Sequence, residues 1–149
     1  MASPLYYSIS YGHQEIKLDT IDYLISLGAD VTIPMDDGDM PMHMGGYNAR
    51  VDVIKTLLKH GADINIINKK GETLLYVCIK QKDFATNAQK LQAVQYMLAQ
   101  GATLAINAEF SIMDLANQHL PDAVDYLEHP ESLPSIEKLE LGLVGDLSD

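Results

Sequence analysis

The side chains that could hold a metal ion or act as a nucleophile are few and scattered along the chain. The sharpest charge cluster is Asp36-Asp37-Gly38-Asp39, whose Asp-x-Asp spacing is that of a calcium loop. No glutamate closes this loop at the required distance, and Asp-Gly is also common turn chemistry. We therefore expect an acidic turn at this point rather than a bound ion.

The remaining candidates for chemistry do not form pairs. Cys78 is the only cysteine, so no internal disulfide and no Cys-x-x-Cys site can form. No His-x-x-x-His spacing and no glycine-rich phosphate loop occurs, and no serine, threonine or cysteine stands in a recognisable nucleophile arrangement. The sequence predicts no enzyme activity, no metal site and no cofactor. The histidines are His13, His43, His60, His119 and His129.

Charge and composition narrow the class of protein. The chain has 149 residues and a net charge of −11, from ten basic and twenty-one acidic side chains. Such a field repels nucleic acid and anionic membranes, and it steers a partner with a basic patch toward the chain. No apolar run approaches a membrane span, and residues 1–4 do not begin a secretory signal. We expect a monomeric cytoplasmic protein that binds neither nucleic acid nor membrane.

A repeated sequence motif indicates the elements that position these side chains. Gly-Ala-Asp follows an apolar helical stretch at Gly28 and again at Gly61, 33 positions later. A degenerate copy, Gly-Ala-Thr, begins at Gly101, 40 positions further on. A period near 33 with a glycine that ends a helix is typical of stacked repeats, and stacked repeats bind partners more often than they catalyse reactions.

A second motif lies in register with the first. The segments 38–46 (GDMPMHMGG) and 71–79 (GETLLYVCI) resemble the G-x-T-P-L-H-x-A-A signature of ankyrin repeats. Residues 3–9 and 111–117 are similar to a first and a last copy. The resemblance covers roughly residues 3–129. It implies an all-α fold, an ankyrin-repeat solenoid of stacked helix–turn–helix units with projecting finger loops.

The resemblance also implies how the chain is divided. We expect an ankyrin-repeat domain over 1–130, then a C-terminal capping helix and acidic tail over 131–149, the helix within 131–141 with Leu133, Ile136 and Leu139 on one face. Near 14–18 and 82–88 the chain has more residues than a standard repeat, which suggests loop insertions. The expected repeats are 3–33, 34–66, 67–107 and 108–130. The expected helices are 41–49, 51–60, 73–82, 88–100 and 122–127.

Three conspicuous residue types receive structural roles from the resemblance. His43 occupies the histidine position of the signature, where the ring hydrogen-bonds backbone and links adjacent repeats. Cys78 stands where the family places a small packing residue, so we expect a buried, inert thiol. Gly45 and Gly46 replace two alanines, which indicates close helix packing.

Partner binding in this family uses the concave surface made by finger tips and the first helix of each repeat. Tyr11 and Tyr47 could form one aromatic patch there, or could fill gaps between repeats. Phe84 could anchor a partner, or could pack against the helices. Carried over position by position, the candidate contacts are Tyr11, Asp36, Asp37, Asp39, Tyr47, Asn48, Lys69, Lys70, Glu72, Lys80, Gln81 and Phe84.

One modification follows from the resemblance. Asn65 matches the position that cytosolic oxygenases hydroxylate in some ankyrin repeats, and Leu57 lies upstream as that pattern prefers. The alternative is a loop asparagine that hydrogen-bonds its own turn.

We therefore expect a non-catalytic module that binds a partner protein on the concave surface of an ankyrin stack. Three narrower alternatives stay open. One is an inhibitor of a kinase or other enzyme, because length, repeat number and acidity resemble the four-repeat inhibitors of cyclin-dependent kinases. Another is a bacterial or viral effector, secreted into a host cell, that mimics host ankyrin proteins. The last is a non-catalytic fragment of a larger enzyme.

Overall fold

The structure is a computed structural model that describes residues 18–33, 38–81, 85–104, 111–136 and 138–139. Its described regular elements are helical, apart from one isolated antiparallel bridge between Ile67 and Thr73. The helices are α2 (Leu18–Ser26), α3 (Pro41–Tyr47), α4 (Val51–Lys59), α5 (Leu74–Lys80), α6 (Asn87–Ala99), α7 (Ile112–His119) and α8 (Val124–Glu128), with the 3-10 turns η1 (Pro121–Ala123) and η2 (Pro130–Ser132).

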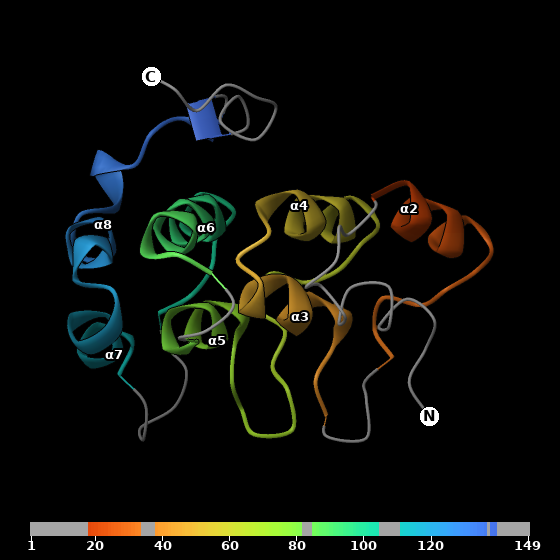
Figure 1. Cartoon of the computed structure of the whole chain (residues 1–149), viewed down its shortest axis with the longest axis horizontal. Helices are drawn as coiled ribbons and strands as arrows, with labels where there is room; N and C mark the ends of the chain where they lie inside the picture. The colour runs from red at the N-terminus through yellow and green to blue at the C-terminus, as the bar shows by residue number, and fades with distance from the viewer. Residues whose placement is uncertain (1–17, 34–37, 82–84, 105–110, 137, 140–149) are drawn as a thin grey trace.

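The helices stack in two layers, as Figure 1 shows. Helices α3, α5 and α7 contact one another in sequence along one layer, and α2, α4 and α6 do so along the other. Each of the pairs α3·α4, α5·α6 and α7·α8 packs across the layers. The loops between successive pairs project from the side of α3 and α5. This arrangement confirms the expected all-α solenoid with projecting fingers.

Local sequence explains where the central helices begin and end. Pro41 opens α3, where its missing N–H leaves no helical hydrogen bond unmade. Thr86 caps α6, because its hydroxyl oxygen accepts from the Gln89 amide while Gln89 Oε1 accepts from the Thr86 amide. Gly61 follows α4 at φ +94°, a left-handed conformation that costs glycine little. The observed boundaries lie within two residues of those expected for these helices.

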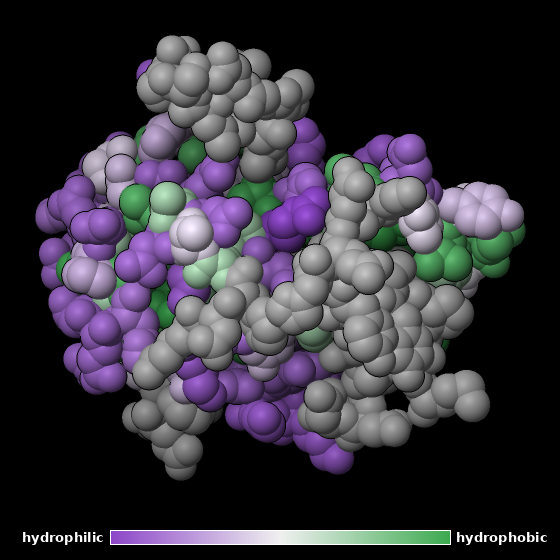
Figure 2. All heavy atoms as spheres, in the orientation of Figure 1, coloured by the Kyte–Doolittle hydropathy of each residue, from purple (hydrophilic) through white to green (hydrophobic). Residues whose placement is uncertain are grey.

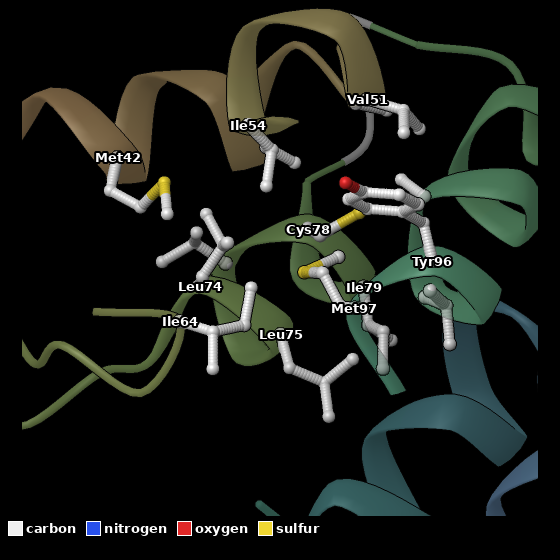
Figure 3. Close-up of a cluster of buried hydrophobic side chains, with 14 of the residues drawn as sticks. Met42, Val51, Ile54, Ile64, Leu74, Leu75, Cys78, Ile79, Tyr96 and Met97 are labelled. Carbon is white, nitrogen blue, oxygen red and sulfur yellow. The ribbon is translucent and has the colours of Figure 1, made fainter. Parts of the chain in front are cut away.

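The core runs between the layers, and α5 is its centre. Every residue of α5 from Leu74 to Ile79 is buried. Figure 3 shows these side chains meeting Ile54 of α4 and Met97 of α6. Cys78 lies within this cluster and is buried, and burial raises the pKa of its thiol to about 12 against the opposing charge of Lys90. The expectation of a buried, inert thiol agrees with this position.

The two glycines of α3 stand where the helices approach most closely. A Cβ added at Gly46 would lie 2.5 Å from Leu74 Cδ1 and 3.1 Å from the Leu74 carbonyl oxygen. A Cβ at Gly45 would lie 3.1 Å from Ile54 Cγ1. Close packing of α3 against both α5 and α4 therefore accounts for the Gly45-Gly46 pair.

The expected helix over 131–141 is wrong in its first half. Residues 130–132 form the 3-10 turn η2, and Leu133 is extended at ψ 140°. Pro134 explains the break, because a proline disfavours helical geometry in the residue before it. Helical backbone resumes only at Ile136. Leu139 is buried whereas Ile136 is 41% exposed, so the two do not share one covered face. The acidic end, 142–149, lies outside the described residues.

Candidate partner-binding surface

The best-defined loop of the solenoid is the hairpin that joins α4 to α5, whose end we call the 67–73 finger. Its two arms meet at the bridge between Ile67 and Thr73. The Asn68 amide donates to the Glu72 carbonyl oxygen at 3.0 Å, and the Gly71 amide donates to the Asn68 carbonyl oxygen at 3.0 Å. These bonds close a tight turn over residues 68–72, with Lys69 and Lys70 at its tip.

The Asn68 side chain holds this turn in one conformation. Its Oδ1 accepts from the amides of Lys70 at 3.0 Å and Glu72 at 2.9 Å. Its Nδ2 donates to Asp39 Oδ1 at 2.8 Å and to Glu72 Oε1 at 3.1 Å. The residue is buried, and these four bonds use its whole hydrogen-bonding capacity. The turn is therefore rigid and is tied to the neighbouring loop through Asp39.

A second set of contacts joins the same finger to the repeat before it. Gly38, at φ +88°, packs so tightly on Lys69 that an added Cβ would overlap the Lys69 side chain and backbone. His43 Nδ1 accepts from the Met40 amide at 3.1 Å, and its Nε2 lies 3.0 Å from the Glu72 carbonyl oxygen. The buried His43 ring thus links adjacent repeats through backbone, as the resemblance implied.

Glu72 does not occupy the surface position that was expected of it. It is 4% exposed, because its carboxylate turns inward to accept from Asn68 and from Lys80 Nζ at 3.3 Å. Its ion pair therefore holds Lys80, an exposed residue of α5, against the base of the finger. Lys80 Nζ also lies 5.4 Å from the centroid of the Tyr76 ring.

The outward side of the finger is basic and partly apolar. Lys69 and Lys70 are exposed, and neither makes an ion pair with the described residues. Ile67, two positions before Lys69, is 55% exposed. The end of this finger projects beyond the helices in Figure 1, and Figure 2 shows hydrophilic surface there. Exposed lysines on a fixed backbone make this the most distinctive charged surface among the described residues.

The candidate contacts on the helices are less available than those on the finger. Tyr47 is partly buried and packs against the core, which favours its gap-filling alternative. Asn48 is half-buried and donates from Nδ2 to the Met44 carbonyl oxygen at 2.8 Å, and Gln81 is half-buried as well. The other candidates, Tyr11, Asp36, Asp37 and Phe84, lie outside the described residues.

The Asn65 side chain connects its own turn to the turn of the next repeat. Its Oδ1 accepts from the Thr103 amide at 2.8 Å, and its Nδ2 donates to the Gly101 carbonyl oxygen at 3.2 Å. Its own amide donates to Asp63 Oδ1 at 2.9 Å. The side chain thus bonds the turn of the next repeat rather than only its own. Hydroxylation of Asn65 stays a prediction, and an oxygenase would have to draw this amide out of both bonds.

Besides the bonds of Asn65 to the next repeat, sequence reasoning missed two further polar contacts between repeats. One is the Asn68 network, which could have been suspected because asparagine in Asn-Lys-Lys-Gly is a typical turn residue. The other joins His60 Nε2 to Asp22 Oδ1 at 2.8 Å, from the end of α4 to α2. Nothing in the local sequence pairs these two residues, because 38 positions separate them.

Among the described residues, no group of three His, Cys, Asp or Glu side chains is placed to hold a metal ion. No described helix is long and apolar enough to span a bilayer.

Comparison with known proteins identifies similarity to ankyrin-repeat proteins. A family model described as ankyrin repeats (3 copies) matches residues 2–68 and 17–109. An ankyrin repeat protein of fowlpox virus is 41% identical over 64 residues, which is 40% of this chain and 19% of the viral protein. The NF-kappa-B inhibitor cactus of Drosophila melanogaster is 33% identical over 73 residues, 47% of this chain and 14% of cactus.

A toxin shows the same partial coverage. Alpha-latroinsectotoxin-Lt1a of Latrodectus tredecimguttatus is 31% identical over 87 residues, 58% of this chain and 6% of the toxin. The chain thus spans less than a fifth of the length of each of these relatives.

Proposed function

Because the chain belongs to the ankyrin-repeat family, whose repeats are generally protein–protein interaction modules, we propose that it binds a partner protein on its finger face. The finger face is the surface formed by the 67–73 finger, the preceding loop at 38–40 and the adjoining ends of α3 and α5. The proposed role is non-catalytic: the stack displays a fixed surface and the partner docks on it.

The observation that carries this proposal is the locked conformation of the 67–73 finger. A loop held by the four bonds of Asn68 loses little conformational entropy when a partner binds. The same bonds leave the side chains of Lys69 and Lys70 outside, free to contact another molecule. A rigid backbone with exposed side chains favours binding, because little conformational entropy is lost.

The net charge supports a further property of the partner. At −11, the field of the whole chain would attract a protein that carries a basic patch and would speed its encounter at low salt. We include this patch in the proposal, together with a monomeric state and a cytoplasmic location.

A position-dependent crosslink tests the proposal. The photoreactive residue benzoylphenylalanine would replace Lys70 at the finger tip or, as a matched control, Lys59 on α4, which is equally exposed on the opposite layer. Irradiation in cytosolic extract should join one protein to the Lys70 position and leave it unjoined to the Lys59 position. Equal capture at both positions, or capture at Lys59 alone, would contradict binding on the finger face.

A second candidate is inhibition of an enzyme or other regulated protein by docking across it. The likeness to cactus, which is named as an inhibitor, favours this version, and the likeness to fowlpox virus proteins favours the effector version. Both would use the same finger face. An inhibitor should lower the activity of its crosslinked target in a purified assay, whereas a scaffold should bind without that loss.

A further inference from the structure

The 67–73 finger carries a charge opposite to that of the molecule around it. The chain as a whole is strongly acidic, yet two adjacent lysines stand at the tip of a loop that the Asn68 side chain holds by four hydrogen bonds. We infer that this finger receives an acidic segment of the partner protein, with carboxylates on Lys69 and Lys70 and an apolar side chain over Ile67. This inference rests on the proposed function and adds the chemistry of what docks on the finger.

The first support is the direction in which the charged groups turn. The described carboxylates of this surface are occupied inside the protein: Asp39 accepts from Asn68, and Glu72 accepts from Asn68 and Lys80. Their negative charge is therefore partly compensated by donors. The two lysines at the tip make no ion pair with the described residues, so they can pair with an anion from a partner.

The second support is the geometry of the arm that carries these residues. Asn68 is buried and points into the turn, whereas Ile67 and Lys69, on either side of it, are exposed. An exposed apolar side chain and an exposed cationic one thus lie two positions apart on the finger. A peptide in which carboxylates flank an apolar side chain matches that pair, and a purely ionic ligand would leave Ile67 uncovered.

The third support excludes the other common polyanion. Nucleic acid spreads charge over many phosphates, and its binding needs a broad basic surface. Here the lysine pair lies within a chain whose net charge is −11, so a long polyanion would be repelled beyond the finger. A short acidic protein segment confines its charge to the finger and avoids that repulsion.

The test uses a defined probe, the fluorescein-labelled peptide Glu-Glu-Leu-Glu-Glu with blocked ends, and measures its binding to the full chain by fluorescence anisotropy. Lys69→Glu/Lys70→Glu should weaken binding about tenfold, because two attractions become repulsions on an exposed surface. Lys55→Glu/Lys59→Glu on α4 makes the same change in net charge and should alter binding by about twofold or less. Circular dichroism should show that both variants keep the fold, since all four lysines are exposed.

A second variant separates this inference from an alternative partner. Asp36 and Asp37 precede Gly38 in the sequence, and Gly38 packs on Lys69. Asp36→Asn/Asp37→Asn removes two negative charges and should tighten the acidic peptide. The inference is overturned if the intact chain binds a single-stranded oligonucleotide of equal charge better than the acidic peptide.

The results also distinguish this inference from the proposed function. If the Lys70 crosslink captures a partner while the acidic peptide fails to bind, partner docking stands and the acidic chemistry is wrong. If neither experiment succeeds, the finger face is not the binding surface and both proposals fail. Equal loss of peptide binding in the lysine variant and in its α4 control would show that only net charge matters, which also overturns the inference.

Discussion

Helices α5 and α2 belong to the same kind of repeat, but their side chains are buried to different extents. Every residue of α5 from Leu74 to Ile79 is buried, because α3 and α7 flank it and α6 covers it. In α2 only Ile21 is buried, and the helix packs against α4. Tyr23 of α2 and Leu27, which directly follows this helix, are exposed, and apolar surface is visible at this end of the stack in Figure 2. Residues Leu74–Ile79 of α5 are both apolar and flanked by helices on two sides, and these two properties together account for their burial.

The sharpest way to break this comparison is to remove equal side-chain volumes from α5 and from the residue that directly follows α2. Ile79→Ala should lower the free energy of unfolding by about 2–5 kcal/mol, because it leaves a cavity among fully buried side chains. Leu27→Ala, at a side chain that is 67% exposed, should change it by about 0.5 kcal/mol or less. Urea titration of both variants measures the difference. Similar losses in the two would mean that the α2 end is covered.

The second comparison is between the locked finger and the helices that carry it. Asn68→Ala should lower the free energy of unfolding by about 2–3 kcal/mol, since it removes four hydrogen bonds and leaves the buried Glu72 carboxylate with fewer donors. Amide exchange should accelerate first at residues 68–72. Asn48→Ala, which loses a single half-buried bond to Met44, provides the matched control. Unchanged exchange in the finger would show that Asn68 does not hold the turn.

Equivalent positions in successive turns provide a finer comparison. Asn65 bonds the turn of the next repeat, whereas Thr32, 33 positions earlier, bonds only Asp30 of its own turn. Asn65→Ala should therefore cost about 1 kcal/mol, and Thr32→Ala about half of that or less. Thermal unfolding of the two variants side by side tests this. Equal costs would argue that the bonds to Gly101 and Thr103 add nothing.

The smallest expected effect concerns pH and the start of α4. Partial burial would by itself raise the pKa of Asp52, but hydrogen bonds and charge from Arg50, together with the Val53 amide, hold that pKa below its usual value. A carboxyl whose pKa is lowered by folding stabilises the fold above its unfolded pKa, and this stabilisation is lost as pH falls.

Arg50→Gln should therefore raise the pKa of Asp52 in an NMR titration. Its loss of stability should be well under about 1 kcal/mol at neutral pH, because the pair is a third exposed, and should begin to shrink as pH falls below about 4. A stability difference that grows toward acid would contradict this account.

Motifs that repeat along the chain were informative because they express local requirements. Gly28, Gly61 and Gly101 all adopt positive φ, so the recurring glycine marked three real helix ends. The signature around His43 led correctly to a link between repeats. Prediction was weaker for residues without a repeat equivalent. In the tail, Pro134 outweighed the apolar spacing of Leu133 and Ile136, and the expected helix began too early.

The candidate site was predictable only in part for the same reason. Lys69 and Lys70 could be placed on a finger from their position in the repeat, and the structure leaves them exposed. Glu72 was expected beside them on the surface, yet it turns inward. Its direction depends on Asn68 and on Lys80, eight positions later, so no inspection of residues 69–73 alone could have revealed it.

The sequence by itself determined the class of the protein: its period, its helix-ending glycines and its signature segments predict an ankyrin stack, because these features depend on neighbouring residues and on a repeat length. Tertiary structure decided which charges face outward. Bonds between repeats, one joining Asn68 to Asp39 and one joining His43 to Glu72, connect residues 29 positions apart. Such bonds exist only after the repeats have stacked, and they leave a basic fingertip on an acidic molecule.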